Sequence, residues 1–192
     1  MLAALIDRVG EPDTDRGRPR GDHYAALVRS IVGQQLSVRA ARAIYGRLLE
    51  QFDGTPPTPE QVLARDAEEL RAAVGLSRAK VSFLRSLAEH VLDGSLELER
   101  LDALPDEDVI AELVAVKGIG EWSAHMFLMF QLKRPDVLAV GDLGIRRAVE
   151  RAYCLPDLPS AADLVRLAEP WRPYRSHACF VLWDSLDNAP VA

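Results

Sequence analysis

Apolar residues recur three and four positions apart in one segment of this chain after another, which is the spacing of one face of an α-helix. Between residues 23 and 33, for example, such a stripe is formed by Tyr24, Leu27, Val28 and Ile31. No segment shows the strict alternation of apolar and polar residues that is typical of a β-strand. The pattern therefore predicts an all-α protein.

Residues that favour helix ends divide these stripes into separate helices. Ser37 is a candidate N-cap, because its hydroxyl can accept a hydrogen bond from an N–H group of the first turn. Thr58, Pro59 and Gln61 have the spacing of a capping box with proline at the first helical position. Further helix boundaries are predicted at Asp66, Gly75, Ser77 and Gly94.

The length of 192 residues fits one domain, and we expect residues 1–192 to form a single domain of two helical lobes around a cleft. The hydrophobic content of 48% is too high for a disordered chain, while no apolar run reaches the roughly 18 to 20 residues needed to span a bilayer. The N-terminus lacks the basic start and the long apolar stretch of a signal peptide. We therefore expect a soluble, cytoplasmic protein that has no membrane partner.

Only two cysteines are present, Cys154 and Cys179. Two thiols cannot supply a four-cysteine zinc site or a cysteine-ligated iron–sulfur cluster, and so few cysteines fit a reducing compartment. We therefore expect neither a disulfide scaffold nor an iron–sulfur cluster.

Charge is distributed unevenly along the chain. The formal net charge of −6 argues against nucleic-acid binding, because binding phosphates needs cations. Residues 16–47, however, contain seven arginines and a single acidic residue, Asp22, whereas residues 60–112 contain six basic and thirteen acidic residues. Either a basic binding surface or chance clustering on solvated helix faces explains this distribution.

Two apolar-periodic segments between about residues 106 and 133 are joined by Lys117, Gly118, Ile119 and Gly120. This arrangement predicts a helix–hairpin–helix. The glycines remove side chains from the turn, so that backbone N–H groups leading into the second helix can approach an anion, which the helix dipole also favours. A DNA phosphate fits such a site; the alternative is an ordinary corner between two helices.

Asp142 follows a short apolar run and precedes another amphipathic segment. An aspartate at such a point is usually an N-cap. The dipole of the following helix would also help to keep the carboxylate ionised. An ionised carboxylate that faces an electrophilic sugar carbon is what cleavage of a glycosidic bond requires, so capping and catalysis are compatible roles for Asp142.

Five motifs resemble those of the helix–hairpin–helix DNA glycosylases in order and spacing: GQQLSVRAARAI, VGLSRAKVSFLRSLA, LVAVKGIGEWSAHMF, VGDLGIRRAV and WRPYRSHACFVLW. The closest resemblance is to the DNA-3-methyladenine glycosylase II branch, which excises alkylated bases. It extends from about His23 to Trp183. The β-rich N-terminal lobe of some bacterial members has no room before His23, so the resemblance implies the compact, all-helical form.

The resemblance assigns a catalytic role to Asp142 and DNA contacts to the turn formed by Lys117, Gly118, Ile119 and Gly120. It also assigns DNA contacts to Gln34, Gln35 and Leu36, and we expect Arg39 and Arg42 to contact phosphates because they follow these residues in the basic stretch. Gln34 to Leu36 match a connector that fills the gap left by the extruded nucleotide. Leu36 suits a wedge between base pairs; the alternative is a buried leucine at a helix start.

In the family, backbone carbonyls that match those of Val114, Val116 and Ile119 hold a monovalent cation, Na⁺ or K⁺, beside the phosphate. No cofactor is otherwise required. The base pocket is predicted to include Trp122, Trp183 and Met126, since an N-alkylated purine is cationic and stacks well on an indole. Met126 and Leu143 replace tyrosines of some members, and Lys117 stands where proline is frequent.

Trp122 occupies the position of the lysine with which bifunctional relatives attack the sugar, and an indole cannot do so. The resemblance thus implies a monofunctional glycosylase of the 3-methyladenine type, which hydrolyses the N-glycosidic bond in base excision repair. We expect a monomer that acts on double-stranded DNA near the nucleoid of a bacterium. Two alternatives stay open: a glycosylase for oxidised, deaminated or mismatched bases, and a non-catalytic DNA-binding module.

Overall fold

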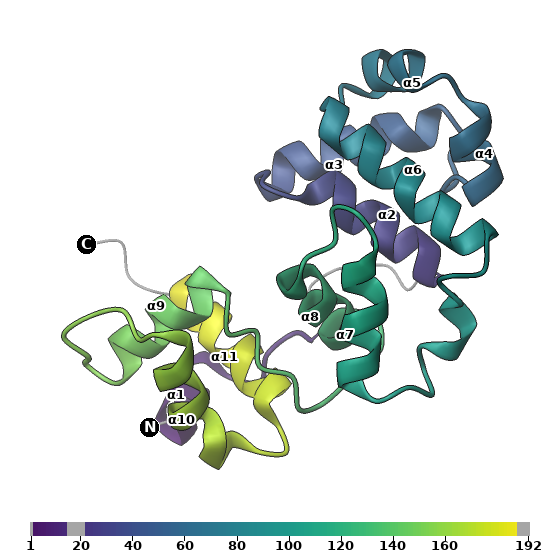
Figure 1. Ribbon diagram of the computed structural model, residues 1–192. Helices are drawn as coiled ribbons and strands as arrows, with labels where there is room; N and C mark the ends of the chain where they lie inside the picture. The colour runs from purple at the N-terminus through teal and green to yellow at the C-terminus, as the bar shows by residue number, and fades with distance from the viewer. Residues whose placement is uncertain (1, 15–21, 188–192) are drawn as a thin grey trace. The chain divides into compact units, whose positions relative to one another are not determined.

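The computed structural model describes residues 2–14 and 22–187, and within these ranges it contains helices, turns and loops but no strand (Figure 1). The predicted all-α class is confirmed. In chain order the elements are α1 (Leu2–Val9), α2 (His23–Gly33), α3 (Val38–Glu50), α4 (Pro59–Ala64), α5 (Ala67–Val74), α6 (Arg78–Leu92), the 3-10 helix η1 (Leu98–Arg100), α7 (Asp106–Ala115), α8 (Glu121–Phe130), α9 (Leu143–Ala152), α10 (Ala161–Ala168), the 3-10 helix η2 (Glu169–Trp171) and α11 (Arg175–Asp187). In the described part of the chain, every helix is too short or too polar to cross a membrane.

The chain divides into two compact units. One unit comprises Arg20–Ala124, and the other comprises Met1–Pro19 together with His125–Ala192. The division falls within α8. We refer to them below as the hairpin unit and the Asp142 unit, after the site residues that each contains.

In the hairpin unit, α2 packs against both α3 and α6, while α4 and α5 pack against α6 (Figure 1). The apolar stripe of α2 faces this core, because Leu27, Val28 and Ile31 are all fully buried. Full burial of an aliphatic side chain stabilises a fold by about 1.5 to 3 kcal/mol. The three- and four-residue spacing in the sequence thus fixes which side of α2 faces the interior.

The predicted helix starts of the hairpin unit are confirmed. The Ser37 hydroxyl accepts a hydrogen bond from the Ala40 N–H, and Thr58 with Gln61 forms the complete capping box. Asp66 and Ser77 cap α5 and α6. The predicted helix ends lie at Gly75, which has the left-handed φ of 79°, and at Gly94, two residues beyond the end of α6.

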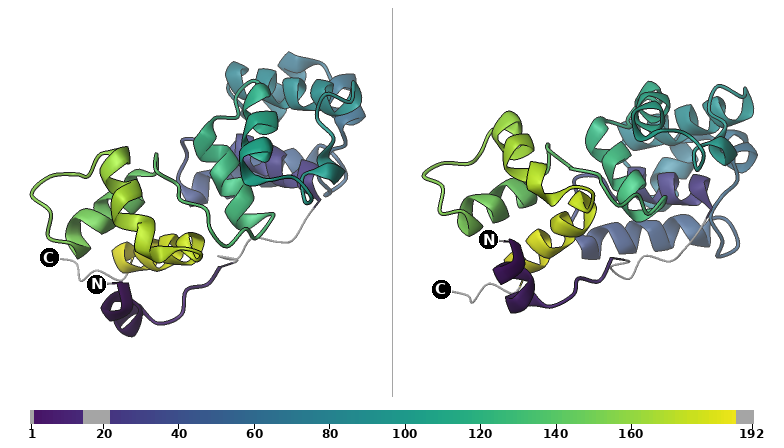
Figure 2. Two further views of the ribbon diagram at one scale, coloured as in Figure 1. Left: turned by 60° about the horizontal axis from the view of Figure 1, so that its bottom comes forward. Right: turned by 90° about the horizontal axis from the view of Figure 1, so that it is seen from below.

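In the Asp142 unit, α11 packs against α9 and α1. Ile145 and Val149 of α9 are fully buried, as are Val181 and Cys179 of α11. Figure 2 shows that the loop between α9 and α10 extends away from both helices. The packing of α11 against α9 brings the C-terminal helix alongside the start of α9, where Asp142 lies.

The hairpin consists of α7, a turn and α8, as predicted from the glycine pattern. The expectation that the second helix continues to about residue 133 is wrong, because α8 ends at Phe130. The N–H groups of Gln131 and Leu132 both bond to the Phe127 carbonyl, and Lys133 has a left-handed φ of 55°. These features end the helix before Pro135 is reached.

Candidate active site

Asp142 is the N-cap of α9, as predicted from the sequence. Its backbone is extended, and its Oδ1 accepts a hydrogen bond of 2.8 Å from the N–H of Ile145. The first N–H groups of a helix have no partner within the helix and carry a partial positive charge, so a carboxylate is stabilised at this point. The side chain is half-buried.

A second donor reaches the same oxygen from α11. The indole Nε1 of Trp183 donates a hydrogen bond of 3.0 Å to Oδ1 of Asp142. The indole is itself packed against two rings: it stacks on Phe130 at a centroid distance of 6.0 Å and lies against Phe180 at 5.8 Å. Two helices therefore fix the orientation of one carboxylate.

Gly144 makes this close approach possible. A Cβ at residue 144 would lie 3.0 Å from Oδ1 of Asp142 and 3.3 Å from both Cδ1 and Nε1 of Trp183. Few real Cβ contacts are this close, so any side chain here would displace the carboxylate or the indole. The glycine lies in the first turn of α9, where alanine would be the better helix former. Leu143, which lies between Asp142 and Gly144 in the sequence, is 48% exposed.

In the hairpin unit, the turn between α7 and α8 depends on Gly118. This residue has a φ of 92°, and a Cβ added to it would overlap the ring of Phe83 from α6. Gly120, by contrast, has no atom close to the place that a Cβ would occupy. The two glycines therefore differ, because Gly118 is required by the fold whereas Gly120 leaves open space at the start of α8.

Gln34 connects the predicted DNA-contact connector to the hairpin. Its Nε2 donates a hydrogen bond of 2.8 Å to the Gly118 carbonyl and one of 3.4 Å to the Ser123 hydroxyl. Gln35 follows with a left-handed φ of 58°. Leu36 is 37% exposed, so the alternative that it is a buried leucine at a helix start is wrong.

Most of the predicted DNA-contact residues of this unit surround one open depression of about 510 Å³. Trp122 lines it and is 43% exposed, so this tryptophan is not part of the core. Phe83 and Ser123 also line the depression and were not predicted, because only the fold brings Phe83 of α6 and the Ser123 hydroxyl close to the connector. The lining residues are Gln34, Gln35, Phe83, Gly118, Ile119, Gly120, Trp122 and Ser123.

Residues 28–173 match the family model described as HhH-GPD superfamily base excision DNA repair protein. The chain belongs to this superfamily. It is 34% identical to DNA-3-methyladenine glycosylase 1 of Schizosaccharomyces pombe over 183 residues, which cover 94% of the chain and 80% of that relative. The resemblance inferred from the five sequence motifs is thereby confirmed.

Two solved structures of such enzymes are similar to this HhH-GPD protein. The Schizosaccharomyces pombe 3-methyladenine DNA glycosylase in complex with abasic DNA has a TM-score of 0.88 and 33% identity, and the match covers 99% of this chain and 93% of that chain. A DNA-3-methyladenine glycosidase from Bacillus halodurans has a TM-score of 0.84 and 37% identity, with 97% and 84% covered.

The carbonyl oxygens predicted to hold a monovalent cation belong to the end of α7 and to the hairpin turn of this HhH-GPD protein. The Val116 carbonyl accepts a hydrogen bond of 3.1 Å from the Ile119 N–H, and a carbonyl oxygen has a second lone pair to offer. Neutral oxygen donors such as these and the Val114 carbonyl fit a hard cation chemically. The described residues contain no group of three or more His, Cys, Asp or Glu side chains suited to a metal ion.

The remaining predicted residues are placed as follows. Arg39 and Arg42 are exposed on α3, while Arg16, Arg18 and Arg20 of the basic stretch lie outside the described residues. Lys117 lines a second depression of the hairpin unit, of about 400 Å³, together with residues of α5 and α6. Met126 is buried, and its contribution to a base pocket stays a prediction.

Proposed function

We propose that this protein is a monofunctional DNA glycosylase that excises alkylated bases of the 3-methyladenine type by hydrolysing the N-glycosidic bond. The observation that carries the proposal is the carboxylate of Asp142, which is held by the N-terminus of α9 and by the Trp183 indole. The similarity to 3-methyladenine glycosylases over almost the whole chain supports the same substrate class.

Alkylation of a ring nitrogen makes the base cationic and weakens its bond to the sugar. As this bond stretches, positive charge develops on the sugar, and a carboxylate that is already fixed in place stabilises that charge without reorganising. The same carboxylate can orient the water that attacks C1′. Asp142 carries one or both of these roles in the proposed reaction.

The target base must leave the duplex before it can reach a carboxylate. In the proposal, Gln35 and Leu36 fill the gap that it leaves, because both are exposed in the connector between α2 and α3. The indole face of Trp183, beside that carboxylate, attracts the cationic base by cation–π interaction. This attraction favours alkylated over neutral bases.

The hairpin supplies the proposed contact to the DNA backbone. The N–H groups at the start of α8 lack partners within the helix and favour an anion such as a phosphate. A monovalent cation bound by the carbonyls of Val114, Val116 and Ile119 would add positive charge beside that phosphate. Lys117 and the exposed Arg39 add further charge, so binding should weaken steeply with salt.

Water, and no enzyme amine, is the proposed nucleophile. Trp122 occupies the place of the Schiff-base lysine of bifunctional relatives, and an indole nitrogen has no basic lone pair with which to attack C1′. The product is then an abasic site in an intact strand. Borohydride should trap no covalent complex between the protein and the DNA.

Base-release assays on methylated, hypoxanthine-containing and oxidised duplexes test the proposal. Release of methylated purines, with an uncut strand until alkali is added, is the expected result. Release of only hypoxanthine or oxidised bases would show that the protein is a glycosylase for a different class of bases. Absence of release from every duplex, with DNA binding retained, would show that it is a non-catalytic DNA-binding module. An adduct trapped by borohydride would contradict hydrolysis by water.

A further inference from the structure

The loop that carries Asp142 lies along α11. This loop, residues 131–142, connects α8 to α9 and ends at Asp142 itself. Two backbone hydrogen bonds lie within its second half: the N–H of Val140 bonds to the Leu138 carbonyl, and the N–H of Asp142 bonds to the Ala139 carbonyl. Residues at the start of α11 add contacts to the loop from outside it.

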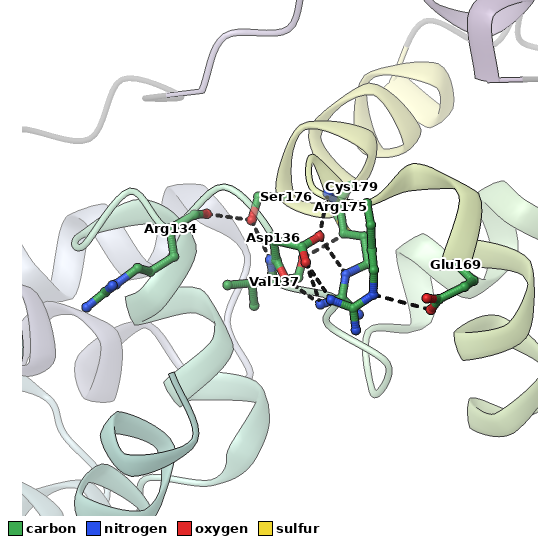
Figure 3. A network of polar contacts seen from close by, with 8 residues as sticks. Arg134, Asp136, Val137, Glu169, Arg175, Ser176 and Cys179 are labelled. Carbon is green, nitrogen blue, oxygen red and sulfur yellow. Dashed lines mark hydrogen bonds and ion pairs between the residues drawn. The ribbon is translucent and has the colours of Figure 1, made fainter. Parts of the chain in front are cut away.

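The first of these contacts is an ion pair between Asp136 in the loop and Arg175 at the start of α11 (Figure 3). The Nε of Arg175 bonds to Oδ1 at 2.7 Å, and its Nη2 bonds to Oδ2 at 3.0 Å and to the Asp136 carbonyl at 2.7 Å. The guanidinium of Arg175 thus forms hydrogen bonds to both the side chain and the backbone of Asp136. Such bidentate geometry is the strongest form of this interaction.

Arg172 adds a second cation on the same carboxylate. Its Nη1 lies 2.7 Å from Oδ2 of Asp136, and its Nε bonds to Glu169 at 3.3 Å. Partial burial by itself would raise the pKa of the Asp136 carboxyl, but the hydrogen bonds and charge of Arg175, with the charge of Arg172, hold that pKa below its ordinary value. Asp136 is accordingly ionised throughout the neutral range.

Ser176, also at the start of α11, bonds to the same stretch of the loop (Figure 3). Its hydroxyl donates to the Arg134 carbonyl at 2.6 Å and accepts from the Val137 N–H at 2.9 Å, while its own N–H bonds to the Pro135 carbonyl at 3.0 Å. The side chain is 3% exposed. Three hydrogen bonds to one buried residue therefore restrain residues 134–137 of the loop.

Residues 176 and 183 are two helical turns apart and lie on one face of α11. Cys179, between them, is buried, and its Sγ lies 3.9 Å from the Val137 carbonyl. One rigid helix face therefore contacts the loop near its middle, through Arg175 and Ser176, and at its end, through Trp183.

We propose that Asp136 and Arg175 are positioning residues for catalysis: by fastening the loop to the start of α11, their ion pair sets the place of Asp142 against Trp183. The role rests on the proposed function, since it presupposes that Asp142 is the catalytic carboxylate. Neither residue has to touch DNA. Loss of the pair lets the loop shift along α11, and a misplacement of about 1 Å can cost on the order of 100-fold in rate.

The test compares Asp136→Asn with Asp163→Asn in the same unit. Asp163 is the control, because it also accepts a hydrogen bond of 2.7 Å from an arginine, Arg166, but it lies in α10, away from the loop, and its second partner is the Ser160 hydroxyl. Single-turnover release of methylated base is measured with enzyme saturating, alongside the Kd for an abasic duplex and the folded fraction at the assay temperature. Saturation removes effects of affinity and of partial unfolding from the rate.

We expect Asp136→Asn to release base at least about tenfold more slowly, with an unchanged Kd, while Asp163→Asn keeps the rate of the unaltered protein. Equal rates in both variants, or equal losses in both, would overturn the positioning role alone. If Asp136→Asn does not fold, the same rate is measured for Arg172→Gln. A decrease of about twofold or more in the rate of base release supports the positioning role, and an unchanged rate overturns it. An unaltered protein that releases no base would overturn the proposed function, and the positioning role with it.

Discussion

The indole nitrogen of Trp183 donates a hydrogen bond to Asp142 across 41 residues of sequence. This bond gives Trp183 a role in addition to the predicted stacking on a cationic base. It holds the carboxylate in the rotamer that also caps α9, and the rings of Phe130 and Phe180 keep the indole in place.

Replacing Trp183 with phenylalanine removes the hydrogen bond and keeps an aromatic ring. A hydrogen bond to a charged group contributes about 1.5 to 3 kcal/mol, so the single-turnover rate of base release should fall by about tenfold or more. Trp171→Phe is the control, because Trp171 also donates through its indole nitrogen, to the Tyr153 hydroxyl at 3.3 Å in the same unit. If both variants lose the same activity, the bond to Asp142 has no special role.

Gly144→Ala should separate stability from activity. Alanine in place of a helical glycine adds up to about 1 kcal/mol of helix propensity, whereas the new Cβ crowds Oδ1 of Asp142 and the Trp183 indole. We expect the thermal midpoint to change little while the rate of base release falls severalfold. In α3, Gly46 has open space for a Cβ, so Gly46→Ala should stabilise the protein and keep its rate. A Gly144→Ala protein with the rate of the unaltered protein would contradict the claim that catalysis requires glycine at this position.

The two hairpin glycines should respond differently to alanine. Gly118→Ala places a Cβ in the Phe83 ring at a positive φ, and we expect a loss of about 2 kcal/mol or more in the free energy of unfolding. Gly120→Ala meets no neighbour, so the stability should hold while the Kd for duplex DNA rises. Chemical denaturation and fluorescence anisotropy measure the two quantities. An unchanged Kd for Gly120→Ala would contradict the proposed contact between a DNA phosphate and the start of α8.

The two cysteines should differ in reactivity. Burial raises the pKa of the Cys179 thiol to about 12, although a backbone hydrogen bond from Ala139 opposes the shift. A raised thiol pKa leaves the group protonated below that pH, and only the thiolate reacts. In the native protein between pH 7 and 9, a thiol reagent should therefore modify only the exposed Cys154, and modify Cys179 after unfolding. Equal labelling of both in the native state would contradict the packing of α11.

Much of the fold is encoded locally and could be predicted for that reason. The side chains of Ser37, Thr58 and Asp142 each accept a hydrogen bond from the N–H three residues later. Donor and acceptor therefore lie within one short segment, and the segment alone predicts the cap. The end of α8 was misplaced by three residues, because the left-handed backbone of Lys133 ends the helix and lysine has no preference for that conformation.

The contacts that build the site could not be predicted in this way. Gln34 bonds to Gly118 across 84 residues, and Asp136 pairs with Arg175 across 39. Such partners are chosen by tertiary packing, which leaves no periodicity in the sequence. The need for glycine at 144 likewise follows only from the position of Trp183.

The most direct test of the catalytic role of Asp142 is the single-turnover rate of methylated-base release by Asp142→Asn. Asparagine is nearly isosteric with aspartate and is an equally good N-cap, so the variant should fold and bind an abasic duplex as the unaltered protein does. Loss of the charge that stabilises the transition state should lower the rate by at least about 100-fold. A rate equal to that of the unaltered protein would contradict this account and leave Asp142 as a helix cap.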